Sequence, residues 1–225
     1  MSRNTPLVVA GSLVHKLYML IQSCMGDDYC FDISISSERR QLDERRLEQA
    51  REAFRKHKGA LLEALTRGER YDIKQVVEDE LVRRSLRCVL GLYKCEALPT
   101  RAAHLTSHAA SYGVASALIF HLSKADRSRY TTLYNSLSAA STACDVTIAR
   151  HLDRECSQDG YTLILVLTVK GLEQLGILKG NLVDLSSLIN AIVEAEENGA
   201  FRRSKAMILD FLVAMKRYLD GLYKG

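Results

Sequence analysis

The chain has 225 residues, of which 47 % are hydrophobic and 26 % charged, with a formal net charge of +4 and a pI near 8.7. This balance excludes an intrinsically disordered chain and suits one domain with a real core, and it is less basic than a dedicated nucleic-acid domain. There are only two prolines, and because proline interrupts helices this scarcity favours a mostly helical chain.

Apolar periodicity, capping residues and glycine stops predict an all-α fold of seven or eight helices in one globular domain, residues 1–225. Residues 1–66 are a candidate N-terminal helical arm. Residues 27–37 alternate apolar and polar side chains with a period of two, but an isolated strand would lack a partner, so we expect an extended connector there. The expected helices cover residues 6–23, 38–66, 72–93, 101–123, 127–157, 161–169, 182–197 and 201–222.

Two apolar segments decide the expected core. After Ser107, residues 101–123 carry almost no polarity beyond hydroxyl groups, and a helix that is apolar nearly all round is a buried one. We therefore expect residues 101–123 to form the buried central helix. The run YTLILVLTV, residues 161–169, fits either a strand or a buried helix, and we favour a helix because no second run of this kind could pair with it.

Cysteine usage bears on the compartment. An even number allows three disulfides in a secreted chain. However, Cys88 and Cys144 fall within helical patterns, where free cysteine acts as a small core hydrophobe. The first apolar run is cut by His15 and Lys16, which is unlike a signal peptide, and no run reaches the roughly 18 apolar residues of a membrane span. We expect a reducing, cytoplasmic environment and no membrane span. The cysteines are Cys24, Cys30, Cys88, Cys95, Cys144 and Cys156.

No motif nominates a catalytic group, a metal site or a cofactor. His104 and His108 share a helix face, but Leu105 stands where a zinc-protease motif needs glutamate, and partly buried histidines are the simpler interpretation. Ser116 lies in GVASA, which lacks the glycine spacing of a nucleophile elbow. An enzyme is therefore the least favoured class.

Basic residues are the remaining signal, since lysine and arginine neutralise phosphates and the nearby Tyr130 and Tyr134 could stack on bases. In residues 38–66, however, pairs such as Glu48 with Arg51 and Glu52 with Arg55 have the spacing that neutralises charge on a helix surface. The candidate nucleic-acid-binding residues form three groups: Arg39, Arg40, Arg45 and Arg46; Lys124, Arg127 and Arg129; and Arg202, Arg203 and Lys205.

The sequence favours a non-enzymatic helical protein that self-associates or binds protein partners through amphipathic helix faces. The alternative is an RNA- or DNA-binding helical protein, such as a coat or regulatory factor, that uses the basic groups. The first hypothesis predicts association that salt hardly weakens, whereas the second predicts affinity that falls steeply with salt.

Overall fold

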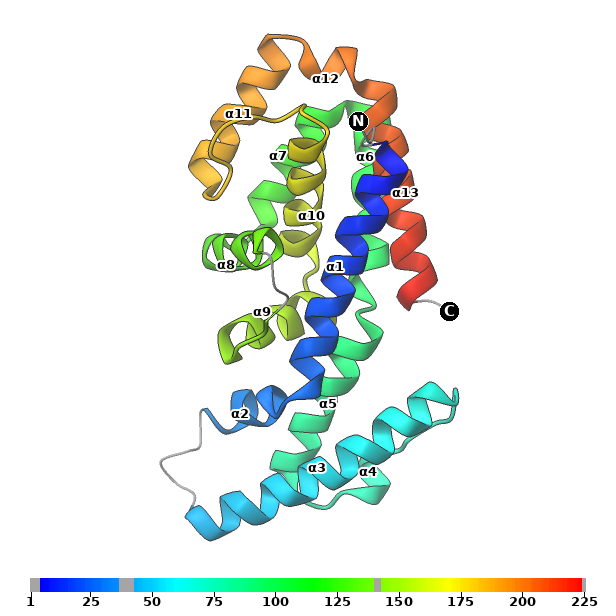
Figure 1. Cartoon of the computed structure of the whole chain (residues 1–225), viewed down its shortest axis with the longest axis vertical. Helices are drawn as coiled ribbons and strands as arrows, with labels where there is room; N and C mark the ends of the chain where they lie inside the picture. Colours follow the sequence, from blue (N-terminus) through cyan, green and yellow to red (C-terminus); the bar gives the residue numbers. More distant parts are fainter. Residues whose placement is uncertain (1–4, 37–42, 140–142, 224–225) are drawn as a thin grey trace.

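The computed structural model describes residues 5–36, 43–139 and 143–223, and within these ranges its regular secondary structure is all α-helix without strands, as predicted (Figure 1). It contains more helices than the seven or eight expected, because several expected helices are interrupted. They are α1 (Pro6–Gly26), α2 (Tyr29–Ile35), α3 (Glu44–Thr66), α4 (Ile73–Val76), α5 (Glu80–Lys94), α6 (Ala97–Tyr112), α7 (Val114–Lys124), α8 (Arg127–Ser138), α9 (Val146–Ser157), α10 (Tyr161–Gln174), α11 (Leu185–Glu197), α12 (Ala200–Arg203) and α13 (Lys205–Tyr223).

The molecule is elongated (Figure 1). Helix α3 crosses one end and α11 and α12 lie at the other, while α1 and α13 run side by side along one flank. Helix α10 is the centre of the core. Every residue from 162 to 172 is buried, and α10 contacts α1, α6, α7, α8, α9 and α13. The predicted helix at residues 161–169 is thus confirmed and is the most buried helix of the chain.

The expected central helix, residues 101–123, was wrong in both continuity and burial. Gly113 adopts φ 95° and ψ 160° and separates α6 from α7. Tyr112 is 76 % exposed, and Ile119 and Phe120 also face solvent. The apolar composition does not show the break at Gly113, and on either side of it apolar side chains face outward.

Three further expectations are corrected by capping geometry and local packing. Residues 27–37 contain the helix α2, in which Phe31 and Ile35, one turn apart, are both buried. The expected helix at 72–93 is broken because the Asp79 carboxylate accepts the N–H groups of Leu81 and Val82 and so begins α5. The expected helix at 127–157 is α8 followed by α9.

All six cysteines form disulfides, so the expected reducing cytoplasm was wrong. Disulfides persist in oxidising compartments, and three of them indicate an extracellular or secreted environment. The helical patterns around Cys88 and Cys144 misled because folding places each beside a cysteine of a distant segment. The bonds are Cys24–Cys144, Cys30–Cys88 and Cys95–Cys156, with Cα–Cα distances of 5.2, 5.6 and 4.1 Å.

Candidate interaction surface

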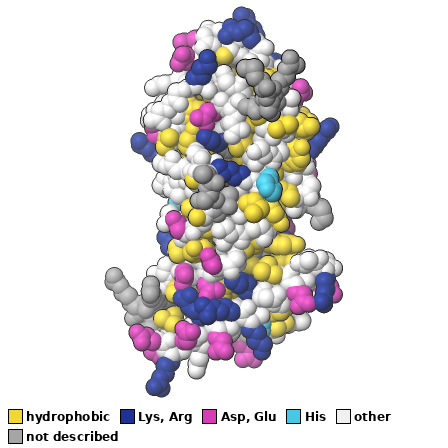
Figure 2. Space-filling model, in the orientation of Figure 1, with side chains coloured by type: hydrophobic (Ala, Val, Ile, Leu, Met, Phe, Trp, Pro, Cys, Tyr) yellow, Lys and Arg dark blue, Asp and Glu magenta, His cyan; other side chains and the backbone are white. Residues whose placement is uncertain are grey.

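The described residues of the first basic group, Arg45 and Arg46, lie on α3, at one end of the molecule. Arg45 and Arg46 are exposed there and border a cavity of about 700 Å³, but Asp43, Glu44 and Asp79 line the same cavity. Figure 2 shows cationic and anionic side chains interspersed over this end. The surface is therefore mixed in charge. Arg39 and Arg40 fall outside the described residues.

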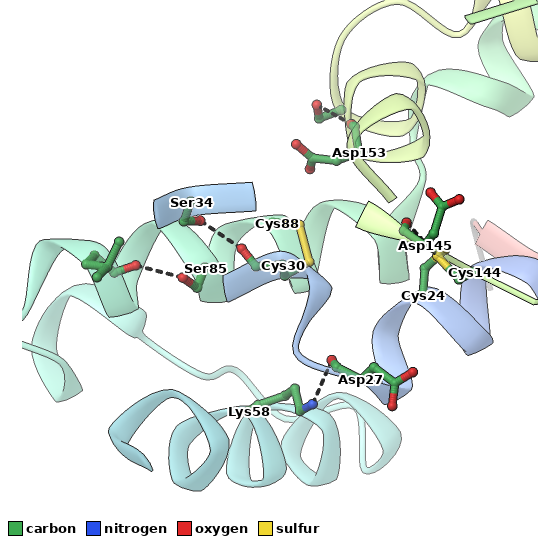
Figure 3. Close-up of a disulfide and its surroundings, with 12 residues drawn as sticks. Cys24, Asp27, Cys30, Ser34, Lys58, Ser85, Cys88, Cys144, Asp145 and Asp153 are labelled. Atoms are coloured by element: carbon green, nitrogen blue, oxygen red, sulfur yellow. Dashed lines mark hydrogen bonds between the residues drawn. A yellow bond between two sulfur atoms is a disulfide. The ribbon is translucent and has the colours of Figure 1, made fainter. Parts of the chain in front are cut away.

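Other cations of α3 contact Asp28, the residue that precedes α2. The Asp28 carboxylate lies 2.7 Å from the Arg55 guanidinium and 3.5 Å from both Arg51 and Lys58. Burial opposes ionisation of Asp28, but the hydrogen bond and charge of Arg55, together with Lys58 and Arg51, outweigh it and lower its pKa. Lys58 also donates to the carbonyl of Asp27 (Figure 3). These cations join α3 to α2 rather than satisfying Glu48 and Glu52 within α3.

Arg129, in the second group, is also a structural residue. Its guanidinium donates to Glu155 at 2.6 Å and to Asp159 at 2.8 Å, and Glu155 is fully buried. The other oxygen of Glu155 accepts the N–H groups of Thr162 and Leu163 and so caps α10. A guanidinium committed to this cluster has little left to offer a phosphate.

The remaining predicted residues are exposed but dispersed. Lys124 and Arg127 lie near the start of α8, whereas Arg202, Arg203 and Lys205 lie around α12, at the opposite end of the molecule from α3 (Figure 1). The described members of the three groups therefore do not assemble into one patch. Nucleic-acid binding by these residues stays a prediction.

The histidines of α6 meet α7 across the bend at Gly113. His108 Nε2 lies 3.2 Å from Ser116 Oγ, and its ring packs against Tyr112 and Phe120. Sequence spacing did not reveal this pair because the bend brings its members together. Among the described residues no carboxylate hydrogen-bonds His108, so the pair lacks the third group that orients a catalytic histidine. No group of three or more described His, Cys, Asp or Glu residues is arranged to hold a metal ion.

His121, on the inner face of α7, is fully buried. Its Nδ1 lies 3.1 Å from the Ala117 carbonyl, and the ring packs on Tyr161. Burial lowers the pKa of His121, and the Ala117 and Arg101 carbonyls only partly oppose this. His121 is thus a buried side chain of the core, and its Nε2 has no hydrogen-bond partner among the described residues.

The clearest exposed apolar surface lies along α1 and α13, where Figure 2 shows hydrophobic side chains gathered. Leu7 is 58 % and Val8 56 % exposed, and Tyr218 and Leu222 of α13 are also exposed. A groove of about 680 Å³ separates the start of α1 from α13, and its lining is mainly apolar. It is lined by Thr5, Pro6, Leu7, Asp210, Val213, Ala214, Arg217 and Tyr218.

Sequence features explain how this groove forms. Thr5 caps α1 by accepting the Val8 N–H, and Pro6 occupies the first helical position. One turn later, Gly11 lets α13 approach closely, because a Cβ at that position would lie 3.2 Å from the Tyr218 ring. We define the α1–α13 face as this groove together with the outward residues of both helices.

By length and composition, α1 is also the one described helix that could cross a membrane. No membrane span was expected from the sequence, because no unbroken apolar run is long enough. In the structure α1 lies in contact with α10 and α13, and its Cys24 is bonded to Cys144. It therefore serves here as a core helix with one exposed apolar side.

Two charges of α13 lie on its outward stripe, which we define as the exposed residues Ala206, Asp210, Arg217 and Gly221 with the half-buried Val213 between them. Asp210 and Arg217 are exposed and form no hydrogen bond or ion pair with the described part of the chain, whereas Lys216 pairs with Asp220 on the same helix at 2.7 Å. The α1–α13 face thus combines exposed apolar side chains with two exposed charges of opposite sign that form no ion pair with the described residues. Comparisons with protein-family models, curated proteins and solved structures each found no match to this chain.

Proposed function

We propose that this chain is a non-enzymatic interaction protein of an oxidising compartment, and that it binds a protein partner through the α1–α13 face. The observation that carries the proposal is the groove beside Leu7, which opens onto large apolar side chains left exposed on two adjacent helices. Contiguous exposed apolar surface of this kind typically marks a site of protein association.

The rest of the molecule suits such a role. Three disulfides and the buried Arg129–Glu155 cluster hold the helices in fixed positions, which lowers the entropic cost of presenting a binding face. The nucleic-acid alternative has less support, because Arg129 is committed to carboxylates and the other basic groups are dispersed.

Photo-crosslinking tests the proposal. A photoreactive phenylalanine analogue replaces Tyr218 in the groove, and in a matched control it replaces Gln75, which is exposed on α4 at the far end. The protein is produced by secretion in its source cells, and adducts are identified by mass spectrometry. We expect protein adducts from position 218 that persist when salt rises from ~0.05 to ~0.5 M, because screening weakens ionic contacts but not apolar burial.

Two outcomes would contradict the proposal. Equal protein adducts from positions 218 and 75 would show that the α1–α13 face is not selective. Nucleic acid that co-purifies with the chain and is released by high salt, together with no protein adduct at position 218, would favour the alternative function.

A further inference from the structure

The outward stripe of α13 has an internal symmetry. About the midpoint between Val213 and Ala214, two pairs of exposed residues on α13 occupy mirrored positions. Asp210 mirrors Arg217, and Ala206 mirrors Gly221. The stripe therefore has a charge of each sign placed symmetrically about an apolar centre, with a small residue beyond each charge.

The two charges cannot satisfy each other within one chain. Asp210 and Arg217 are seven residues apart, so they are separated by roughly 10 Å along the helix axis. Neither forms a hydrogen bond or ion pair with the described residues, while both are exposed. Each charge is thus free for a partner outside the monomer.

The small residues permit a close approach. Ala206 and Gly221 are exposed, and a Cβ added at Gly221 would meet nothing within 4 Å. Small side chains at a contact bring helix axes to the short end of the usual 8–10 Å range. A second helix could therefore lie along this stripe over its whole length.

We propose that the occupant of the α1–α13 face is a second copy of this chain, bound so that the two α13 helices run antiparallel about a twofold axis between Val213 and Ala214. This inference rests on the proposed function and names its partner. A twofold interface uses the same patch on both copies, so residue i contacts j and j contacts i. Asp210 then meets Arg217 of the second copy, twice, and Ala206 meets Gly221.

The apolar groove completes the interface. In this arrangement both α1 helices lie on the same side of the α13 pair. The exposed part of Tyr218 from one copy then faces the mouth of the other copy's groove, which Leu7 and Asp210 line. Leu7 and Tyr218 lose their solvent exposure together, which supplies the apolar burial that two exposed ion pairs alone would not.

Charge reversal in the full disulfide-bonded chain tests the pairing. Asp210→Arg places a second guanidinium opposite Arg217 at two symmetric sites, and Arg217→Asp places two carboxylates together in the same way. We expect each single variant to weaken the dimer roughly 10- to 30-fold in sedimentation equilibrium, because two attractive contacts become repulsive. The double variant Asp210→Arg/Arg217→Asp restores dimerisation, and an equimolar mixture of the two single variants forms a heterodimer.

The controls are reversals of exposed charges elsewhere: Glu196→Arg on α11 and Arg150→Asp on α9. These should leave the dissociation constant within about threefold of wild type, since they lie outside the interface. Circular dichroism confirms that each variant is folded. Rescue in the double variant and the mixture supports the twofold arrangement. Single variants as dimeric as wild type, or a double variant as weak as the singles, would overturn it.

The inference and the proposed function can fail separately. A wild-type monomer at about 100 μM, well above typical working concentrations, overturns the dimer. If position 218 then crosslinks to a different protein, the proposed function stands with another partner. If it crosslinks to nothing, both fail.

Discussion

Helices α9 and α13 are both amphipathic and both carry aspartate and arginine, but their charges lie in opposite settings. Helix α9 is surrounded by α1, α2, α5, α6, α8 and α10, and its Glu155 is buried against Arg129. Helix α13 is covered on its inner side by α1 and α6, whereas Asp210 and Arg217 face water and pair with none of the described residues.

The comparison shows that a buried ionic residue and an exposed one have different roles. The buried Glu155 carboxylate accepts three hydrogen bonds and so holds α8, α9 and α10 in place relative to one another. It has no capacity left for an external partner. An exposed, unpaired charge contributes little to folding and remains available for recognition. Substitution of Glu155 in α9 should therefore lower the free energy of unfolding and leave association unchanged, whereas substitution of Asp210 or Arg217 in α13 should weaken association and leave the free energy of unfolding nearly unchanged.

The largest effect is expected from Glu155→Ala in α9. This change leaves the Arg129 guanidinium without its buried partner and two N–H groups of α10 without an acceptor, so we expect a loss of about 3–5 kcal/mol in unfolding free energy. Urea denaturation under non-reducing conditions measures it. The control is Asp159→Asn, whose side chain is 43 % exposed and also pairs with Arg129. A loss in Glu155→Ala no larger than in this control would refute the buried role of Glu155.

The second effect concerns the disulfide that precedes α9. Replacing both Cys24 and Cys144 by serine removes a crosslink between residues separated by 120 positions. We expect a loss of about 2–4 kcal/mol, because the unfolded chain gains freedom. Urea denaturation again measures this loss.

Self-association provides the internal control for that variant. Cys24 lies at the opposite end of α1 from Leu7 and the groove, so we expect the dissociation constant of the proposed dimer to stay within about threefold of wild type. A dimer lost along with this disulfide, at temperatures where the variant is folded, would show that the two regions are coupled.

These charge roles mark the limit of what the sequence could predict. The all-α class and the helix at residues 161–169 were predictable, because few prolines and a continuous apolar run without a partner strand are properties of the chain itself. The sequence placed Arg129 in a binding patch because its carboxylate partners Glu155 and Asp159 are 26 and 30 positions away. Pairing over such distances depends on how helices pack.

The same limit applies to the cysteines and the exposed face. Six cysteines allow 15 pairings by simple counting, and helical periodicity gives no reason to prefer bonded over free thiols. The apolar residues of α1 and α13 were predicted as helix faces, but which of them remain exposed depends on where Gly11 lets α13 approach. A short apolar stripe has the same appearance in the sequence whether it is buried or open.

A third effect, with a pH signature, comes from Asp153, a carboxylate of α9 for which burial raises the pKa to about 6 from an ordinary value near 3.8 (Figure 3). Because the folded state resists ionisation, Asp153 costs nothing below pH ~4 and lowers stability as pH rises from ~4 to ~6. We expect Asp153→Asn to be more stable than wild type by about 1–2 kcal/mol at neutral pH, allowing for partial exposure, and equal to it below pH ~4.

Thermal unfolding across this pH range measures the Asp153 effect, and Asp126→Asn serves as a control of opposite sign. The pKa of Asp126 is lowered because its carboxylate accepts the Arg129 N–H and the Ser128 hydroxyl. Asp126→Asn should therefore be less stable than wild type at neutral pH and approach it as pH falls below ~4. The same pH dependence in both variants would contradict the assigned cause.

The smallest effect on folding, and the sharpest contrast with α9, is expected from neutralising α13. Asp210→Asn and Arg217→Gln remove charges that have no partner among the described residues, so the unfolding free energy of the dilute monomer should change by less than about 0.5 kcal/mol. The same variants should weaken self-association severalfold, because each loses two contacts across the twofold axis. Urea denaturation at low concentration and sedimentation at high concentration separate the two readouts. A stability loss as large as that of Glu155→Ala would mean that α13, like α9, uses its charges to hold the fold, and the distinction between the two helices would not stand.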